Sequence, residues 1–214
     1  MEGCLSASAP SSSGSSTGKR PPVFVITGTS GEGKSTLARS LLERVPELEL
    51  AVSATTRERR PGEKDGREYY FISDEEFERR LARDDFLEYV RLPWGEGRRS
   101  GTLWSELERI TAAGRPVLLE LETNGALAVR DRIPGSVTIF VTAPSEAELE
   151  RRLRARGTES EGEIEERLEK ALHQRRLAGE FAYTIVNDDL ERAIDELEGI
   201  VRKELAATGS MPGR

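Results

Sequence analysis

The sequence predicts an α/β fold built on a parallel β-sheet, with a second, smaller unit inserted into it. Short apolar runs rich in β-branched residues alternate with longer charged stretches of helical spacing, and this alternation is typical of βαβ units. The runs carry few polar residues, as expected of strands that helices cover on both faces. Residues of about 50–103 interrupt the alternation, because their pattern is one of short strands and turns around a single helix.

Each core element can be assigned from its own pattern. The first strand, Val23–Thr27, stops at Gly28, and three further buried strands are expected at 116–121, 136–141 and 183–186. Apolar residues at helical spacing predict core helices at 35–45, 104–113, 124–132, 145–155, 164–179 and 190–204, and one helix at 74–81 in the insertion. Ligands of such folds bind outside the carboxyl ends of the strands, so the turns at Gly28 and at 120–125 point to one site.

Length and composition divide the chain further. At roughly 150 residues per domain, 214 residues indicate one elaborated domain or two small ones. We expect a folded region at 21–206, made of a core at about 21–49 and 104–206 and the insertion at about 50–103. Residues 1–20 are rich in Ser, Gly and Ala and have little to bury, so they and residues 207–214 are expected to be flexible ends.

Composition also excludes several classes of protein. Lys and Arg number 32 against 39 Asp and Glu, and the net charge of −7 argues against bulk binding of nucleic acid. No apolar run approaches the ~20 residues of a membrane span, and the single Cys4 excludes a disulfide framework and fits a reducing compartment. We therefore expect a cytoplasmic protein without nucleic-acid or membrane partners. One histidine, His173, leaves no material for a multi-histidine metal site or a Ser-His-Asp triad.

Residues 28–35 match the phosphate-loop pattern G-x-x-x-x-G-K-[ST] in full, between an expected strand and an expected helix. Glycines let the backbone approach a phosphate, and the N–H groups at the helix N-terminus supply a positive field. Lys34 would reach the β- and γ-phosphates, and the Ser35 hydroxyl would reach Mg²⁺. A nucleoside triphosphate is therefore expected to contact Thr29, Ser30, Gly31, Glu32, Gly33, Lys34, Ser35 and Thr36.

The loop by itself does not distinguish a GTPase switch, an ATPase motor and a small-molecule kinase. A GTPase would also be expected to carry an Asn-Lys-x-Asp segment that recognises the base, and the sequence has none. A motor ATPase would usually be larger, with an apolar strand that ends in Asp-Glu. The rest of the sequence has to decide.

The deciding stretch is residues 52–71, Val-Ser-Ala-Thr-Thr-Arg-Glu-Arg-Arg-Pro-Gly-Glu-Lys-Asp-Gly-Arg-Glu-Tyr-Tyr-Phe, which together with the phosphate loop closely resembles the guanylate kinase family. The resemblance covers about 22–204 and continues through Glu88, Gly101-Thr102, 120–122, 156–159, Arg167-Leu168 and 187–189. It implies a P-loop kinase core, an inserted subdomain that binds a nucleoside monophosphate, and a helical lid at about 152–168. It also implies the reaction ATP + GMP = ADP + GDP, by direct in-line transfer with Mg²⁺.

Three residues of this stretch have the chemistry of a phosphate site. Arg57 and Arg60 lie three positions apart, close enough to grip one phosphate with charge-assisted bonds, and Tyr69 could add a phenol donor. In the resembling family these positions hold the monophosphate of GMP. A solvated basic turn is the alternative interpretation, since Arg59 and Arg67 are also present.

Guanine presents N1–H and N2–H₂ as adjacent donors, a pair that one carboxylate accepts and that adenine lacks. A carboxylate therefore selects guanine through the penalty of an unpaired group, commonly ~1–3 kcal/mol. The resemblance assigns this role to Glu88, and it assigns hydroxyl contacts with the base to Ser53 and Thr102. Taken alone, Glu88 would more often be an exposed carboxylate at a strand end.

One departure from the family concerns the acceptor phosphate. Family members usually show Asn-Tyr-Tyr-Gly-Thr where residues 98–102 are Arg-Arg-Ser-Gly-Thr, so Ser100 replaces a tyrosine that helps to bind the GMP phosphate. We hypothesise that Arg99 or Arg98 takes over this contact, because a guanidinium is a stronger phosphate partner than a phenol.

A second departure concerns the metal. The family's Asp-x-Asp turn is Glu120-Leu121-Glu122 here. The resemblance implies one carboxylate near the metal, so Ser35 and Glu120 are expected to hold Mg²⁺, and it implies that Glu122 lies near the base of GMP. Each glutamate is one methylene longer than aspartate, and a shift of about an ångström can cost ~10²-fold in rate.

Phosphoryl transfer requires two aligned nucleotides and the neutralisation of spreading negative charge. A basic helix end at 151–156 and a returning helix with Arg167 resemble the mobile lid of nucleoside monophosphate kinases. We expect Arg156 and Arg167 to stabilise the negative charge on the transferred phosphoryl group, and Arg152 is a further candidate for this role. Pairing with glutamates at i,i+4 would occupy some of these arginines. Asn187 resembles the family's contact with the adenine side of ATP.

Two other functions stay open on the sequence alone. One is a catalytically weak relative that phosphorylates another acceptor, which the changes at Ser100 and Glu122 motivate. The other is a binding module, because guanylate-kinase-like domains of scaffold proteins have lost phosphotransfer. The phosphate loops of such modules are usually degraded, whereas Lys34 and Ser35 are intact here. Monomer and homodimer are both open.

Overall fold

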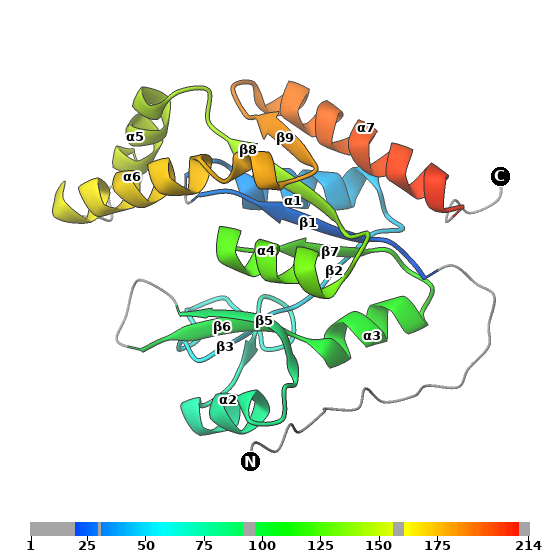
Figure 1. Cartoon of the computed structure of the whole chain (residues 1–214). Coiled ribbons are helices and arrows are strands. Elements are labelled where there is room, and N and C mark those ends of the chain that lie inside the picture. The colour runs from blue at the N-terminus through cyan, green and yellow to red at the C-terminus, as the bar shows by residue number, and fades with distance from the viewer. Residues whose placement is uncertain (1–19, 30, 92–96, 156–160, 210–214) are drawn as a thin grey trace, which may run out of the picture.

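The chain forms two β-sheets with helices packed around them (Figure 1). The computed structural model describes residues 20–29, 31–91, 97–155 and 161–209. The tail predicted at 1–20 therefore lies outside the described residues except for Arg20, as do residues 210–214 of the predicted C-terminal end. The predicted α/β class with a parallel sheet is confirmed.

The larger sheet is parallel and five-stranded, in the order β2-β7-β1-β8-β9. Its strands are β1 (Val23–Thr27), β2 (Glu49–Leu50), β7 (Val117–Glu120), β8 (Val137–Thr142) and β9 (Tyr183–Val186). Four of them match the strands predicted from apolar runs. The two-residue β2 is too short to produce such a run.

Alternate residues of β1 belong to opposite layers of the core. Phe24 and Ile26 pack with α1 (Lys34–Arg44) and α7 (Leu190–Thr208), while Val23 and Val25 pack with α3 (Trp104–Ala112) and α4 (Thr123–Arg132). All five residues of β1 are buried, which explains why the strand is apolar on both faces. The helices cover the two faces of the sheet and not the edge at which β1 and β7 have their carboxyl ends. Ligands of such sheets bind at this edge.

The smaller sheet is mixed and four-stranded, in the order β4-β3-β6-β5. Its strands are β3 (Ala54–Thr55), β4 (Tyr70–Phe71), β5 (Phe86–Arg91) and β6 (Arg99–Leu103), and α2 (Asp74–Leu81) packs on it through Phe77. Strand β6 pairs antiparallel with β3 and β5, and β3 pairs parallel with β4. The predicted pattern of short strands around one helix is confirmed, with the helix at the predicted residues.

Two further helices, α5 (Glu146–Arg154) and α6 (Glu161–Arg175), lie near β8 and the N-terminal end of α1 (Figure 1). They pack on each other through Leu149, Leu153 and Ala171. Helix α6 starts and ends earlier than the predicted 164–179, and residues 178–180 form a short 3₁₀ helix instead. Helix α7 continues past the predicted end at 204, so residues 207 and 208 are helical, and Gly209 ends it in the left-handed conformation.

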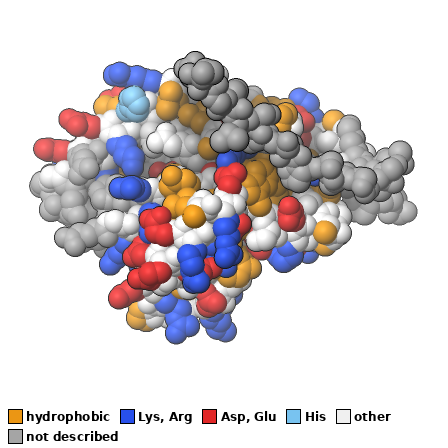
Figure 2. Space-filling model, turned by 60° about the horizontal axis from the view of Figure 1, so that its bottom comes forward, with side chains coloured by type: hydrophobic (Ala, Val, Ile, Leu, Met, Phe, Trp, Pro, Cys, Tyr) orange, Lys and Arg blue, Asp and Glu red, His pale blue; other side chains and the backbone are white. Residues whose placement is uncertain are grey.

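None of the helices in the described part of the chain is long and apolar enough to cross a lipid bilayer. Acidic and basic side chains are interspersed on the face shown in Figure 2. Ion pairs such as Arg151–Glu148 and Arg152–Glu148 connect successive turns of α5. The helical pairing of lid arginines that the sequence suggests is therefore present.

Candidate active site

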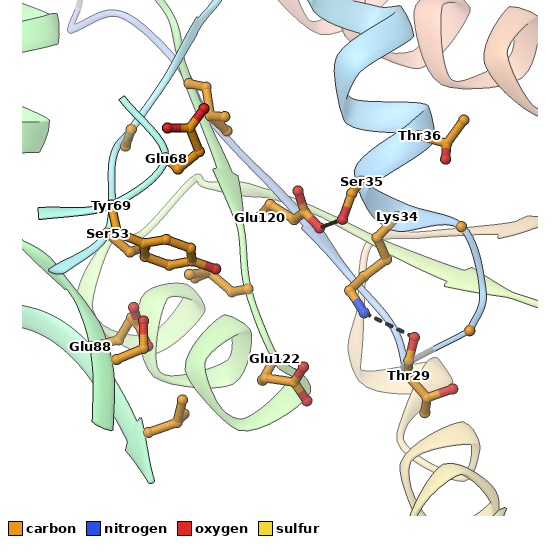
Figure 3. A pocket seen from close by; sticks show the side chains of 17 residues that line it. Thr29, Lys34, Ser35, Thr36, Ser53, Glu68, Tyr69, Glu88, Glu120 and Glu122 are labelled. Atoms are coloured by element: carbon orange, nitrogen blue, oxygen red, sulfur yellow. Dashed lines mark hydrogen bonds between the residues drawn. The ribbon is translucent and has the colours of Figure 1, made fainter. Parts of the chain in front are cut away.

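A cavity of about 390 Å³ lies between the carboxyl edge of the larger sheet and the smaller sheet (Figure 3). The phosphate loop, the start of α1 and the end of β7 form one side of it, and the smaller sheet contributes the other. The lining residues are Thr29, Gly31, Gly33, Lys34, Ser35, Thr36, Leu50, Ala51, Ser53, Glu68, Tyr69, Glu88, Val90, Ser100, Glu120, Leu121 and Glu122. Residues predicted for the triphosphate thus share one cavity with five residues predicted for the monophosphate, whereas the other four of that set, Arg57, Arg60, Arg99 and Thr102, are not among its lining residues.

The backbone of the phosphate loop requires its glycines. Gly28, Gly31 and Gly33 have φ angles of 142°, 99° and 89°, a region that L side chains rarely adopt. A Cβ at Gly28 would also lie 2.2 Å from the carbonyl oxygen of Val141. Gly33 is the N-cap of α1, so the loop brings the N-terminus of this helix to the cavity. Ser30 of the predicted set lies outside the described residues.

Lys34 and Ser35 line the cavity beside the phosphate loop. Lys34 Nζ donates hydrogen bonds to the carbonyl oxygens of Gly28 at 2.6 Å and Thr29 at 2.9 Å, so the ammonium lies over the loop. Ser35 Oγ donates to Glu120 Oε1 at 2.5 Å, which joins α1 to the end of β7 (Figure 3).

The pair formed by Ser35 and Glu120 fits the predicted magnesium site. A hydroxyl and a carboxylate supply hard oxygen ligands, which Mg²⁺ prefers together with water and phosphate oxygens. The described ranges hold no group of three or more His, Cys, Asp or Glu side chains that could hold a metal ion. Most ligands of a magnesium ion here would therefore come from the nucleotide and from water.

Glu32 supports the phosphate loop from the interior of the protein. Its side chain is fully buried, and Oε2 accepts a hydrogen bond from the Thr29 N–H at 2.7 Å. Burial raises the pKa of Glu32, while the bonds from Thr29 and the charge of Lys34 oppose the rise. Asn187 Nδ2 donates to the Glu32 carbonyl oxygen at 2.7 Å, and a Cβ at Gly33 would lie 2.4 Å from that nitrogen. Asn187 therefore braces the loop, and its contact with adenine stays a prediction.

Glu88 lies at the opposite end of the cavity. It is 5% exposed, and its Oε1 accepts hydrogen bonds from the N–H and the hydroxyl of Thr102, each at 2.9 Å. Ser53 Oγ lies 3.4 Å from Thr102 Oγ1, so the three side chains predicted to recognise guanine lie together. Burial raises the pKa of Glu88 to about 7 despite the bonds from Thr102. Gly125 of α4 leaves room for this carboxylate, because a Cβ there would lie 2.6 Å from Oε2.

Arg57 and Arg60 both contact one glutamate. Arg57 donates to both carboxylate oxygens of Glu63, at 2.8 and 3.0 Å, and the Arg60 N–H donates to the same group at 2.7 Å. The Arg57 guanidinium also lies 5.3 Å from the centre of the Tyr69 ring, which lines the cavity. Hydrogen bonds from Arg57 and Arg60 lower the pKa of Glu63 to about 2. A bound monophosphate would thus have to compete with a charged carboxylate for Arg57.

The structure does not bring Arg99 to the cavity. Its guanidinium forms ion pairs with two carboxylates of α2 and lies 4.6 Å from the centre of the Phe77 ring. Strand alternation explains the difference: Ser100 lines the cavity, so its neighbour Arg99 faces the other side of β6, toward α2. Arg98 precedes β6 and is exposed, and its contact with a phosphate stays a prediction.

The arginines predicted for the lid are only partly placed. Arg152 donates to Glu148 at 2.7 Å and to the carbonyl oxygen of Asn187 at 2.9 Å, so it connects α5 to the segment after β9. Arg167 lies on α6 and outside the set of residues that line the cavity. Arg156 lies outside the described residues.

Helix α5 also contacts the phosphate loop directly. A Cβ at Gly31 would lie 3.1 Å from side-chain atoms of both Leu149 and Leu153. These leucines are fully buried. The first helix of the predicted lid therefore packs against the loop itself, and a larger side chain at Gly31 would displace it.

Two residues of the site have no role assigned to them from the sequence. Glu68 lines the cavity beside Tyr69, and Gly125 lies against Glu88. An isolated glycine inside a helical pattern is a signal of a packing or functional constraint, so Gly125 could have been singled out. Glu68 carries no such signal, because it is one of 39 acidic residues in a highly charged chain.

Comparison with known proteins decides the family. A model of the guanylate kinase family matches residues 20–204. The chain belongs to the guanylate kinase family. It is 46% identical over 186 residues to the guanylate kinase of Symbiobacterium thermophilum, which covers 87% of each chain. It is 44% identical over 184 residues to that of Desulfitobacterium hafniense, covering 85% of this chain and 90% of the relative.

Solved structures agree with the family assignment. The crystal structure of guanylate kinase from Anaplasma phagocytophilum matches with a TM-score of 0.69 at 30% identity, over 87% of each chain. TT1252 from Thermus thermophilus, 18% identical with a TM-score of 0.50 over 87% of this chain and 99% of its own, shares the fold alone. The resemblance to guanylate kinases and the kinase class predicted from the sequence are therefore confirmed.

Proposed function

We propose that this protein transfers the γ-phosphoryl group of ATP to GMP and produces ADP and GDP. Membership of the guanylate kinase family supports this reaction. The observation that carries it for this chain is the pairing of Lys34 and Ser35 with Glu88 across one cavity (Figure 3). Two nucleotides bound at these ends would have their phosphates between them.

At the acceptor end, Glu88 accepts the N1–H and N2–H₂ donors of guanine. Thr102 occupies Oε1 from one side, which orients the carboxylate and leaves Oε2 free of bonds from Thr102. The carboxylate of Glu88 must be ionised to accept both hydrogen bonds from guanine, so protonation of Glu88 opposes the binding of GMP. Ser53 and Glu122 also line the cavity and complete the proposed base contacts.

The phosphate of GMP binds Arg57, Arg60 and Tyr69 in this proposal. The dianionic phosphate displaces the singly charged Glu63 from Arg57. Arg57 is attracted more strongly to two negative charges on a phosphate than to one on a carboxylate. Ser100 and Arg98 are the proposed further contacts in place of the family's tyrosine.

At the donor end, loop N–H groups and the N-terminus of α1 cradle the phosphates, and Lys34 exchanges its bonds to loop carbonyls for bonds to phosphate oxygens. Ser35 and Glu120 would hold Mg²⁺, which would offset negative charge on the donor phosphates when bound. An oxygen of the GMP phosphate attacks the γ-phosphorus in line, and the bond from that phosphorus to the ADP oxygen breaks. We assign charge stabilisation during this step to Arg156 and Arg167, with Arg152 in reserve.

The proposal includes the setting of the reaction. Residues of about 50–103 form the acceptor-binding unit and those of about 152–168 the lid. A reducing cytoplasm fits the single cysteine of the chain. We assign no oligomeric state.

Formation of ADP from ATP and Mg²⁺ tests the proposed function, with GMP, dGMP, AMP, CMP and UMP as acceptors. We expect strong activity with GMP and little with AMP, CMP and UMP. Lys34→Ala should abolish most of the activity while the exposed neighbour control Arg39→Ala should not. Activity with none of the acceptors, alongside intact ATP binding, would overturn the proposal and favour another acceptor or a binding module.

A further inference from the structure

Glu106 is a buried carboxylate that no step of the proposed reaction uses. It lies in the first turn of α3 and is 3% exposed. Its Oε1 accepts from the Val52 N–H at 3.1 Å and from Arg109 Nη2 at 3.0 Å, and its Oε2 accepts from the Tyr70 hydroxyl at 3.3 Å and from Arg109 Nε at 3.0 Å. Buried carboxylates are costly unless paired and hydrogen-bonded, so these partners hold Glu106 in one place.

Two of these partners are direct neighbours of cavity residues. Val52 precedes Ser53 and Tyr70 follows Tyr69, and both Ser53 and Tyr69 line the cavity. The Tyr70 N–H donates to the Ser53 carbonyl oxygen at 3.0 Å, so the two segments are also joined to each other. Successive side chains of extended backbone point to opposite sides. Glu106 therefore contacts these two segments on the side away from the cavity, whereas Ser53 and Tyr69 face the cavity.

Glu106 also lies where the chain passes between the two sheets. Residues 51–53 lead from β2 of the larger sheet to β3 of the smaller one, and β6 returns directly into α3. Glu106 accepts a hydrogen bond from the Val52 N–H, so it links residues 51–53 to the start of α3. Arg109 extends this link to the larger sheet, because its Nη2 also donates to Glu49 of β2 at 2.7 Å.

The charge of Glu106 contributes to this link. Burial raises the pKa of Glu106, but the hydrogen bonds from Arg109 and from the Val52 N–H outweigh burial, and the resulting pKa is lowered. The carboxylate is therefore ionised at neutral pH and pairs with Arg109. An uncharged amide could keep one acceptor oxygen but would lose the ion pair.

We propose that Glu106 is a positioning residue for the acceptor end of the cavity: it holds Ser53 and Tyr69 in place relative to the larger sheet. The inference deepens the proposed function and rests on it, since it concerns the affinity for GMP. Glu106 acts through the Val52 backbone and the Tyr70 phenol, and it differs in this from Glu88, which is proposed to touch the base. In the described part of the chain Glu106 accepts hydrogen bonds from Val52, Tyr70 and Arg109 and from no residue of the donor end, so ATP binding should not depend on it.

Initial rates at varied GMP and varied ATP test the inference. Glu106→Ala should raise KM for GMP by about 10-fold or more and leave KM for ATP within about twofold, because displaced Ser53 and Tyr69 would lose their proposed hydrogen bonds to GMP, each worth roughly two- to tenfold in affinity. Glu106→Gln keeps an acceptor for the Val52 N–H and should recover part of the affinity. Tyr70→Phe removes a single hydrogen bond and should raise KM for GMP by about two- to fivefold, roughly the value of one such bond. This variant keeps the test usable if Glu106→Ala does not fold.

Glu108→Ala, at an exposed glutamate of the same helix, is the matched control and should change neither KM. If the wild type does not phosphorylate GMP, the proposed function is wrong and the inference falls with it. If the wild type is active but Tyr70→Phe and Glu106→Ala leave KM for GMP within twofold, the inference alone is wrong. An equal rise of both KM values would also overturn it, because Glu106 would then support the whole cavity and not its acceptor end in particular.

Discussion

Glu88→Gln separates the stability of the fold from the recognition of guanine. Burial raises the pKa of Glu88 from its ordinary 4.5 to about 7. At about 1.36 kcal/mol for each pH unit, ionised Glu88 lowers the free energy of unfolding by about 3 kcal/mol. Glutamine carries no charge, and its amide oxygen can still accept both hydrogen bonds that Thr102 donates to Oε1.

The sign follows from the direction of the shift. A carboxyl whose pKa is higher in the folded state contributes stability that is complete below its unfolded value and is lost as the pH rises through the folded value. Wild type and Glu88→Gln should therefore have similar stability near pH 4.5 and below. Between about pH 4.5 and about pH 7 the wild type should lose stability relative to the variant, and above about pH 7 the gap should be complete. The expected gap approaches about 3 kcal/mol at alkaline pH.

Urea unfolding at about pH 5 and about pH 8 measures this gap as the difference between the two free energies of unfolding. Glu108→Gln, at an exposed site, should follow the wild type at both pH values to within about 0.5 kcal/mol. Parallel stability curves for wild type and Glu88→Gln would refute the reasoning, because they would mean that Glu88 has the same pKa in the folded and unfolded states.

The same variant should bind GMP poorly, although it is the more stable protein. In the wild type, KM for GMP should rise as the pH falls below about 7, by up to tenfold for each pH unit, because only ionised Glu88 accepts the guanine pair. In Glu88→Gln, KM for GMP should be high and independent of pH over the same range. A wild-type KM for GMP that stays constant between about pH 5 and about pH 8 would contradict the assignment of Glu88.

Three further substitutions test other parts of the site. Gly125→Ala should raise KM for GMP by about 10- to 100-fold, because its Cβ would lie 2.6 Å from Glu88 Oε2. It should not lower the stability, since alanine favours the helix by about 1 kcal/mol. An unchanged KM for GMP would show that Glu88 has room to move. Arg99→Ala should lower the free energy of unfolding by about 1–2 kcal/mol, because the stacking and the ion pairs of Arg99 are lost. It should leave KM for GMP within twofold. A tenfold rise in KM for GMP would instead favour the contact with the GMP phosphate that the sequence predicts for Arg99. Gly33→Ala should raise KM for ATP and not for GMP, since its Cβ would lie 2.4 Å from Asn187 Nδ2, and ATP titration of the variant checks this.

Local patterns suffice for the phosphate loop and for the core strands. The loop needs its glycines, its lysine and its serine within eight consecutive residues, because one turn of backbone has to surround a phosphate. Strands buried on both faces appear directly as apolar runs. The face of Arg99 was also predictable, since the alternation along β6 separates it from Ser100. The role of Glu88 needed family resemblance, because a single glutamate has no pattern of its own.

The sequence by itself thus determined the class of fold and the family, and it named the candidate residues for the two ends of the cavity. Tertiary structure alone decided which of these residues are buried and what they contact. Gly125 makes room for Glu88, and Glu106 binds the Val52 N–H across 54 positions of sequence. The pKa of Glu88 depends on burial that the whole fold creates. The physical reason is that propensity and periodicity act over a few neighbouring residues, whereas desolvation and close approach depend on how two sheets pack against each other.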